Sequence, residues 1–184
     1  MRTLFIDTGH STRFPGAGGF RSEVLWVRSV WLELSKLIDK IQWNVVLVPD
    51  SYKTDWLGSN NNLIHRIQFI NKSCKDGDWL ISIHGNAATN HEVRGVTTCF
   101  MGGSEYMRKK AIELSKWVSS TTGMPIWNGG AFDDRTGRWG RIGMVRDTRP
   151  PALLVECGFV SNRLDMETLP IQAAQGINNF IKTL

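Results

Sequence analysis

Apolar residues occur along the chain in short runs that polar or glycine-containing segments separate. Short runs bounded by turn-forming residues are typical of buried strands. We therefore predict strands over residues 3–8, 45–48, 79–83, 93–101 and 151–155. Each run is short enough to be a strand rather than a buried helix.

Between these runs, apolar residues recur at spacings of three and four, the period of a helix with one buried face. This pattern predicts helices over residues 22–41, 105–119 and 169–182, with Ser22 as the N-cap of the first. The polar residues 50–61 are interpreted as a loop. A further helix is predicted from the apolar face formed by Leu63, Ile64, Ile67 and Ile70.

The alternation of strands and helices determines the fold class. It predicts an α/β architecture with a single twisted, largely parallel or mixed sheet of about six strands flanked by helices. We expect residues 1–184 to form a single domain. Ligands of such sheets bind at the carboxyl ends of the strands, and His10, His84 and Glu156 all map to that edge.

The amino-acid composition is that of an ordinary globular protein. Hydrophobic residues make up 41% and charged residues 21% of the 184 residues, which excludes a disordered or collagen-like chain. The three cysteines have no paired close spacing, so they predict neither a disulfide framework nor a Cys-x-x-Cys zinc site. We interpret them as small buried residues: Cys74, Cys99 and Cys157.

Hydropathy and charge bear on location and partners. Asp7 interrupts the N-terminal apolar residues, and no apolar run approaches the roughly 20 residues that span a bilayer. We therefore expect synthesis in the cytoplasm without a signal peptide and no stable membrane insertion. The net charge of +5 suits an anionic partner, which leaves nucleic acid, an acidic membrane and a cell-wall polymer open.

The residues at the carboxyl edge suggest a hydrolytic metal site. Such a zinc site uses neutral imidazoles and a carboxylate as ligands and keeps one position for water. His10 and His84 supply two ligands, and Glu23, near the start of the first predicted helix, is well placed as the third. An acid at a helix start also has the ordinary role of favouring the helix dipole. Glu156 is the candidate base that takes a proton from zinc-activated water.

Four blocks of the chain carry these candidate residues. They are Asp7–His10, Glu23, Ser82–Ala87 and Leu154–Asn162. In order and spacing they resemble the zinc-dependent N-acetylmuramoyl-L-alanine amidases of the Amidase_3 family, which include phage endolysin-like catalytic domains. Two supporting segments, 63–71 and 144–151, are also similar to those of the family, so the resemblance covers nearly the whole chain.

The resemblance implies a reaction and a role for each candidate residue. With it, we expect residues 1–184 to be a single catalytic domain without a separate wall-binding module. The reaction is hydrolysis of the amide between the lactyl group of N-acetylmuramic acid and the L-alanine of the stem peptide. By the resemblance, His10, Glu23 and His84 bind one Zn²⁺ and Glu156 is the catalytic carboxylate. Residues 11–12 are Ser-Thr, where the family usually has two glycines.

Substrate contacts are expected from Asn86, Arg146 and Trp139. Arg146 belongs to a basic stretch that is open to three interpretations: a solvated loop, a nucleic-acid contact, or attraction of the anionic wall. We favour the wall. The stretch comprises Arg135, Arg138, Arg141, Arg146 and Arg149, with Trp139 among them.

Several alternatives remain at this stage. One is a catalytically silent wall-binding module, another is a zinc amidase or peptidase acting on soluble muropeptides, and a third is a basic nucleic-acid binder. We interpret His65 and His91 as structural, because neither falls on a ligand position of the family. The preferred hypothesis is a peptidoglycan hydrolase, with no nucleic-acid partner and a monomeric state. It reaches the wall after release from the cytoplasm, as phage endolysins do.

Overall fold

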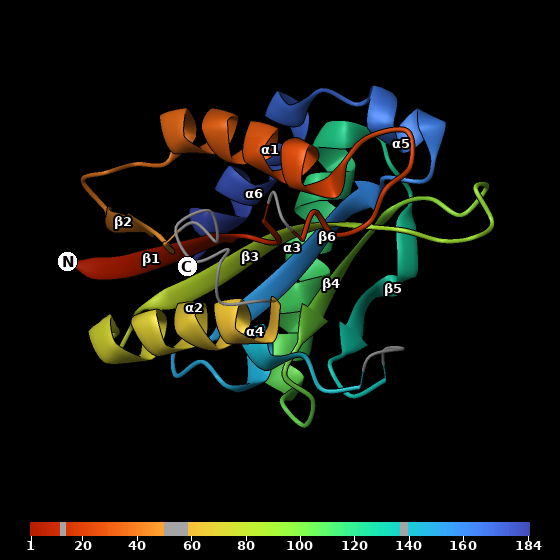
Figure 1. Cartoon of the computed structure of the whole chain (residues 1–184). Coiled ribbons are helices and arrows are strands. Elements are labelled where there is room, and N and C mark those ends of the chain that lie inside the picture. The colour runs from red at the N-terminus through yellow and green to blue at the C-terminus, as the bar shows by residue number, and fades with distance from the viewer. Residues whose placement is uncertain (12–13, 50–58, 137–139) are drawn as a thin grey trace.

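The computed structural model describes residues 1–11, 14–49, 59–136 and 140–184, which form a six-stranded sheet with helices on both faces (Figure 1). The strands are β1 (Arg2–Thr8), β2 (Trp43–Leu47), β3 (Trp79–Asn86), β4 (Val96–Phe100), β5 (Ile126–Asp133) and β6 (Ala152–Phe159). The helices are α1 (Glu23–Leu37), α2 (Ser59–Ser73), α3 (Glu105–Thr122), α4 (Gly143–Arg146), α5 (Arg163–Glu167) and α6 (Pro170–Ile181).

The sheet has the strand order β2-β1-β3-β6-β4-β5 and is mixed. Strands β2, β1, β3 and β6 run parallel to one another, whereas β4 pairs antiparallel with β6 and parallel with β5. The prediction of an α/β fold with a largely parallel or mixed sheet of about six strands is confirmed. The last strand in the chain, β6, lies in the interior of the sheet.

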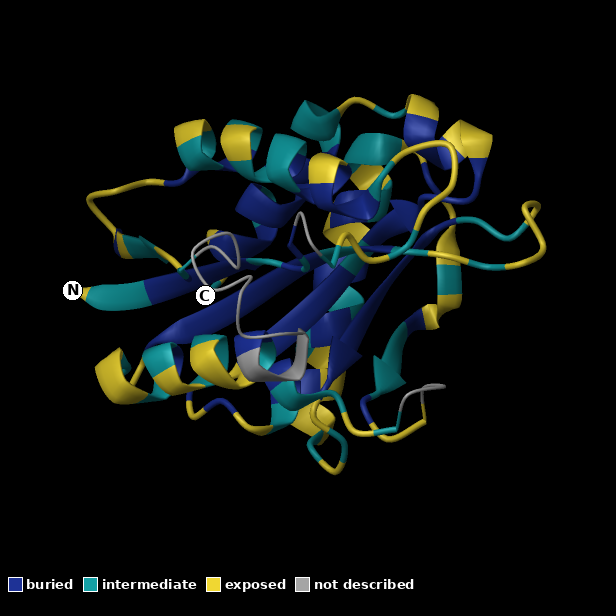
Figure 2. Ribbon diagram, viewed as in Figure 1, coloured by how far each residue is buried: buried dark blue, intermediate teal, exposed yellow. Residues whose placement is uncertain are grey.

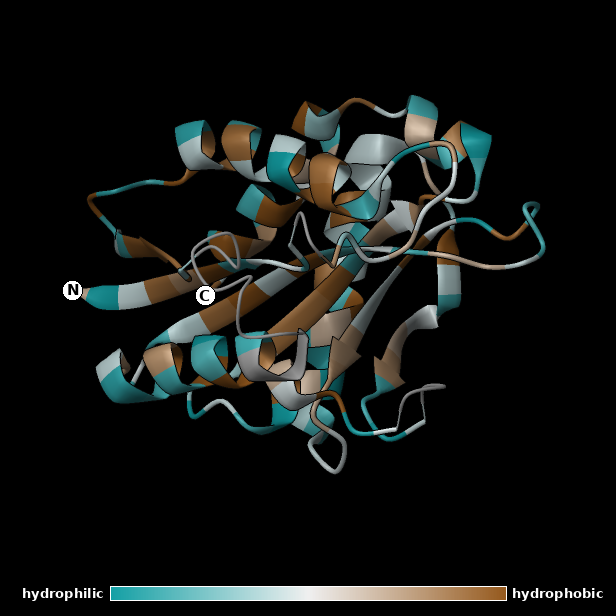
Figure 3. Cartoon of the chain, viewed as in Figure 1, coloured by the Kyte–Doolittle hydropathy of each residue, from teal (hydrophilic) through white to brown (hydrophobic). Residues whose placement is uncertain are grey.

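Two helical layers cover the sheet. Side chains of α1, α3 and α6 pack with one face of the strands in the larger buried cluster, and α2 and α4 pack with the other face. Within β1, Leu4 and Ile6 join the larger cluster and Phe5 joins the smaller one, as the alternation of side chains in a strand requires. The strands are accordingly mostly buried in Figure 2 and mostly hydrophobic in Figure 3.

The ends of the first two helices differ from the predictions. Helix α1 ends at Leu37 rather than at residue 41, and Ile41 is 90% exposed, because the chain turns there to bring Trp43 into β2. Ser22 is at the N-cap of α1, but its side chain makes no capping hydrogen bond. Ile64 is 51% exposed and does not share the buried face of α2.

The predicted loop at 50–61 is wrong for residues 59–61, which begin α2, while residues 50–58 lie outside the described residues. Asparagines fill most of that first turn, so it carries no apolar periodicity that would reveal a helix.

Strand β5 was not predicted, and its sequence explains why. It lies at an edge of the sheet, and Asn128, Gly129 and Gly130 all have positive φ angles of 48°, 67° and 82°. These residues accompany a shift of register between β4 and β5. An edge strand with such an interruption lacks the alternating pattern from which strands are predicted.

Candidate active site

The turn after β1 brings His10 against His84. His10 adopts a left-handed conformation with φ of +64°, which is uncommon outside glycine, and the Gly9 N–H donates to the Ile83 carbonyl at 3.1 Å. A Cβ at Gly9 would lie 2.2 Å from the His84 ring. Glycine therefore lets the two histidine rings approach, and their centroids are 4.9 Å apart.

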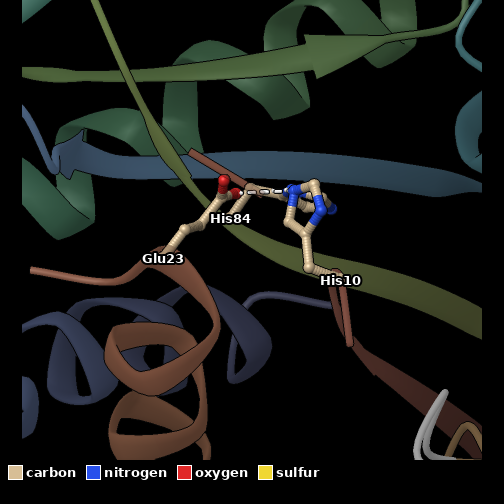
Figure 4. A group of neighbouring side chains, drawn as sticks. All are labelled: His10, Glu23 and His84. Atoms are coloured by element: carbon tan, nitrogen blue, oxygen red, sulfur yellow. Dashed lines mark hydrogen bonds and ion pairs between the residues drawn. The ribbon is translucent and has the colours of Figure 1, made fainter. Parts of the chain in front are cut away.

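Glu23 joins the two histidines from the first residue of α1 (Figure 4). Its Oε1 lies 3.0 Å from His10 Nε2 and 3.0 Å from His84 Nδ1. The backbone N–H groups of Ala17 and Gly85 also donate to this carboxylate, at 2.8 and 3.1 Å. Glu23 is only 3% exposed, so its position is fixed by four donors from three segments.

The charge of Glu23 suits a cation. Burial alone would raise its pKa, but hydrogen bonds with His10 and His84 and the backbone donors around it favour the ionised form. The pKa of this carboxyl is therefore well below its ordinary value. Ionised Glu23 is thus a ligand that needs to lose no proton before binding a metal.

The donor set fits a zinc ion. One ligand atom from each of His10, Glu23 and His84 can be chosen so that all three lie within 4.8 Å of one another. Two imidazole nitrogens and a carboxylate oxygen are ligands that zinc accepts, with a position left for a reactant. Gly16 closes the loop over this cluster, since a Cβ there would lie 2.3 Å from Glu23 Oε2.

Glu156 lies beside the cluster, within β6 rather than after its end. It is register-paired with His84 on the neighbouring parallel strand, so both side chains project from the same face of the sheet. Its Oε2 is buried and has no hydrogen-bond partner among the described residues. Burial, and then the negative charge of Glu23, raise the pKa of Glu156 to about 8. Such a group exchanges a proton readily near neutral pH.

Behind the cluster lies a buried ion pair. Asp7 is 1% exposed and accepts from Arg66 Nη1 at 2.5 Å and from Ser82 Oγ at 2.6 Å. Asp7 lies inside β1, and these two bonds link β1 to α2 and β3. The role of Arg66 was missed, because a single arginine on a predicted helix resembles any surface cation.

The expected substrate contacts lie in different environments. The Asn86 side chain accepts from the Ala87 N–H at 2.8 Å at the end of β3. Arg146 donates through Nε and Nη2 to Asp134, both at 2.5 Å, so its guanidinium is already held by a buried acid. Trp139 lies outside the described residues.

Three of the five arginines in the basic stretch are paired with carboxylates. Besides the bonds of Arg146 to Asp134, Arg135 pairs with Asp133 and Arg141 pairs with Asp147. Arg138 lies outside the described residues. The attraction of an anionic wall by this stretch stays a prediction. Among the described residues, no helix has the length and hydropathy to cross a bilayer.

Comparison with known proteins agrees with this geometry. The family model described as N-acetylmuramoyl-L-alanine amidase matches residues 4–182. An uncharacterized cell wall amidase from Bacillus anthracis is 25% identical over 170 residues, which make up 91% of this chain. The chain spans only 32% of that relative's length.

Two solved structures illustrate the similarity of fold. The CwlD amidase from Clostridioides difficile, in complex with the GerS lipoprotein, has a TM-score of 0.80 and 25% identity, with 100% of this chain and 98% of that chain covered. The catalytic domain of the CD27L endolysin, which targets the same bacterium, has a TM-score of 0.71 and 22% identity, with 99% and 95% covered.

The family match covers nearly the whole chain, including all three candidate ligands and Glu156. The chain therefore belongs to the Amidase_3 family of N-acetylmuramoyl-L-alanine amidases.

Proposed function

We propose that this chain hydrolyses the amide between N-acetylmuramic acid and the L-alanine of the peptidoglycan stem peptide. The observation that carries the proposal is the convergence of His10, Glu23 and His84 beside Glu156 in a member of this family. A silent wall-binding module has no need for a buried base next to a metal-type donor cluster. We also propose that residues 1–184 act as a single catalytic domain.

We propose that His10, Glu23 and His84 hold one Zn²⁺. The chemistry that zinc supplies when bound is Lewis acidity, which polarises a carbonyl oxygen and makes water a stronger nucleophile. The protein contributes the rigidity of the site, because the ligands are fixed by the Gly9 turn, the start of α1 and β3. Fixed ligands hold the reacting groups in one geometry and so reduce the entropic part of the barrier.

Glu156 moves the proton in this reaction. Its carboxylate takes a proton from the attacking water and, as the acid, donates that proton to the departing nitrogen of L-alanine. A pKa near 8 suits both steps, since neither form of the group is strongly disfavoured at neutral pH. The reacting amide must therefore lie between Glu156 and the His10–Glu23–His84 cluster.

We further propose an endolysin-like role, in which the enzyme meets the wall only after the membrane has been permeabilised. The similarity in fold to the catalytic domain of the CD27L endolysin supports this proposal. Expression in a susceptible bacterium is expected to cause lysis only when a membrane-permeabilising agent is added. Lysis of growing cells without that agent would contradict the proposal.

The function is tested by digesting purified peptidoglycan with the protein and analysing the products by mass spectrometry. We expect free stem peptides with a new L-alanine N-terminus, their loss on chelation, and their return when zinc is restored. Binding to the wall without peptide release would favour the silent module. Release from soluble muropeptides but not from intact sacculi would favour the second enzyme class.

A further inference from the structure

Three register-paired residues form a row across the inner strands β3, β6 and β4, near the carboxyl ends of β3 and β6, and one of them is the candidate ligand His84. His84 on β3 pairs with Glu156 on β6, and Glu156 pairs on its other side with Thr97 on β4. Residues paired directly across neighbouring strands project from the same face, with Cβ atoms about 4.5–5.5 Å apart in an antiparallel pair. Thr97 is therefore the neighbour of Glu156 on the side away from the metal cluster.

Thr97 and Glu156 share an unusual property. Thr97 is fully buried, and its Oγ1 has no hydrogen-bond partner among the described residues. Glu156, its register partner on β6, also carries an unpartnered buried oxygen, Oε2. Most buried polar atoms in proteins are hydrogen-bonded, so two unsatisfied oxygens on facing residues require an explanation.

Packing does not provide that explanation. A valine at position 97 would fill the same space in β4 without burying a hydroxyl. The next residue, Thr98, is also fully buried, but its hydroxyl is bonded to Ser115 Oγ at 2.7 Å on the opposite face of the sheet. The hydroxyl of Thr98 therefore has a structural partner. The hydroxyl of Thr97 has none among the described residues, and it lies on the same face of the sheet as Glu156.

We infer that Thr97 is a positioning residue for Glu156. A hydroxyl both donates and accepts, so Thr97 can donate to the Glu156 carboxylate and accept from the protonated acid once either side chain rotates toward the other. One contact thus holds the carboxyl group in place in both protonation states. This inference rests on the proposed function, because it assigns Thr97 to the proton-transfer step of that reaction.

The test compares Thr97→Val with Thr98→Val, two matched substitutions at adjacent buried positions. We expect Thr97→Val to lower kcat about 10- to 100-fold on a soluble muramoyl-peptide, with KM and zinc content unchanged. Its melting temperature should change little, because valine fills the same space and the loss of the contact with Glu156 is offset by the removal of a buried hydroxyl. Thr97→Ser, which keeps the hydroxyl, is expected to restore most of kcat.

Thr98→Val is expected to show the reverse pattern. Loss of the bond to Ser115 should lower the melting temperature by about 2–4 °C and leave kcat unchanged. A wild-type kcat in Thr97→Val overturns the inference. So does a kcat in Thr97→Ser as low as that in Thr97→Val.

A separate measurement tests the contact between Thr97 and Glu156 if the proposed function is wrong. If the wild-type protein releases no stem peptide, the contact is measured directly from the ¹³C chemical shift of the Glu156 carboxyl in metal-free wild type and Thr97→Val. A difference in that shift between the two proteins supports the contact. Equal shifts overturn it.

Discussion

Glu156 combines a proposed catalytic role with an environment that disfavours its ionised form. Its carboxyl is buried beside the negative charge of Glu23, and its Oε2 has no hydrogen-bond partner among the described residues. An ionised group in such a place opposes folding. The residue proposed to move the proton is thus also expected to reduce the stability of the metal-free protein.

This expectation gives a pH-dependent prediction for Glu156→Gln. The carboxyl pKa is about 8 in the folded protein and near 4.5 in the unfolded chain, so the folded state holds the proton more tightly. The free energy of unfolding of the metal-free wild type should therefore decrease as pH rises from about 4.5 to 8. Above pH 8, Glu156→Gln should be more stable by about 1–3 kcal/mol and should release no stem peptide.

Urea denaturation of both metal-free proteins at pH 5 and pH 9 measures this difference. The two proteins differ only at position 156, so the comparison isolates Glu156. A gap in stability that stays the same at the two pH values would contradict the raised pKa.

At the residue scale, chemically distinctive side chains at strand ends were predictable. His10, His84 and Glu156 each follow an apolar run, and the structure brings them to one edge of the sheet. Their roles as zinc ligands and base stay predictions. Arg66 and Thr97 were not predictable, because their significance depends on burial and on the residue paired with them across the sheet.

At the scale of elements, the ion pair of Arg66 and Asp7 joins α2 to β1. The Arg66 side chain is 11% exposed and that of Asp7 is 2% exposed, so neither charge is solvated when its partner is removed. Burial raises the pKa of Asp7, but Arg66 and the Ser82 hydroxyl outweigh burial and hold the pKa below its ordinary value.

We predict that Arg66→Met lowers the free energy of unfolding by about 3–5 kcal/mol at pH 7, because it leaves a buried carboxylate unpaired. The stabilisation by ionised Asp7 is present above its unfolded pKa near 3.8 and is lost as pH falls through the lower folded value. The destabilisation should therefore shrink below pH 4.

Denaturant titrations at pH 7 and pH 3 test this prediction. Arg163→Met is the control, because Arg163 pairs with Glu167 on the exposed surface of α5 and its removal should have little effect. Equal losses of stability in the two variants would contradict it.

The burial and the length of an element explain whether the sequence predicted it. Strands β1, β3 and β6 were predicted because both faces are buried, which makes their sequences continuously apolar. The polar residues that extend β3 and β6 through His84 and Glu156 were not recognised as strand. The five-residue helix α5 and the four-residue helix α4 are too short to show a helical period.

At the scale of the whole molecule, the candidate metal site connects segments that are distant in the chain. Its ligands come from the turn after β1, the start of α1 and the end of β3. A ligand that binds only the folded state stabilises it by mass action. Zinc should therefore stabilise the entire fold and not the site alone.

We predict that zinc at about 100 times its Kd raises the melting temperature by about 5–10 °C above that of the chelated protein. Glu23→Gln removes the negative ligand and should abolish this shift. Glu33→Gln, on the exposed side of the same helix, should keep it. Differential scanning calorimetry with and without chelator measures the shift, and a full zinc effect in Glu23→Gln would exclude Glu23 as a ligand.

The fold class was predictable because alternating strands and helices allow few arrangements. The order of the strands was not, because the reversal of β4 and β5 depends on pairing between distant segments. The pairing within the basic stretch was also not predictable, since only the folded structure identifies which nearby carboxylate each arginine contacts.

The interior position of β6 determines when the sheet can be completed during synthesis of the chain. Its neighbours, β3 and β4, are synthesised first but do not pair with each other, so the sheet stays divided until residues 152–159 emerge from the ribosome. The candidate metal ligands all precede this segment, whereas Glu156 arrives with it. A nascent chain can therefore carry every candidate ligand and still lack the proposed base, so the strand that completes the sheet is also the one that completes the proposed site.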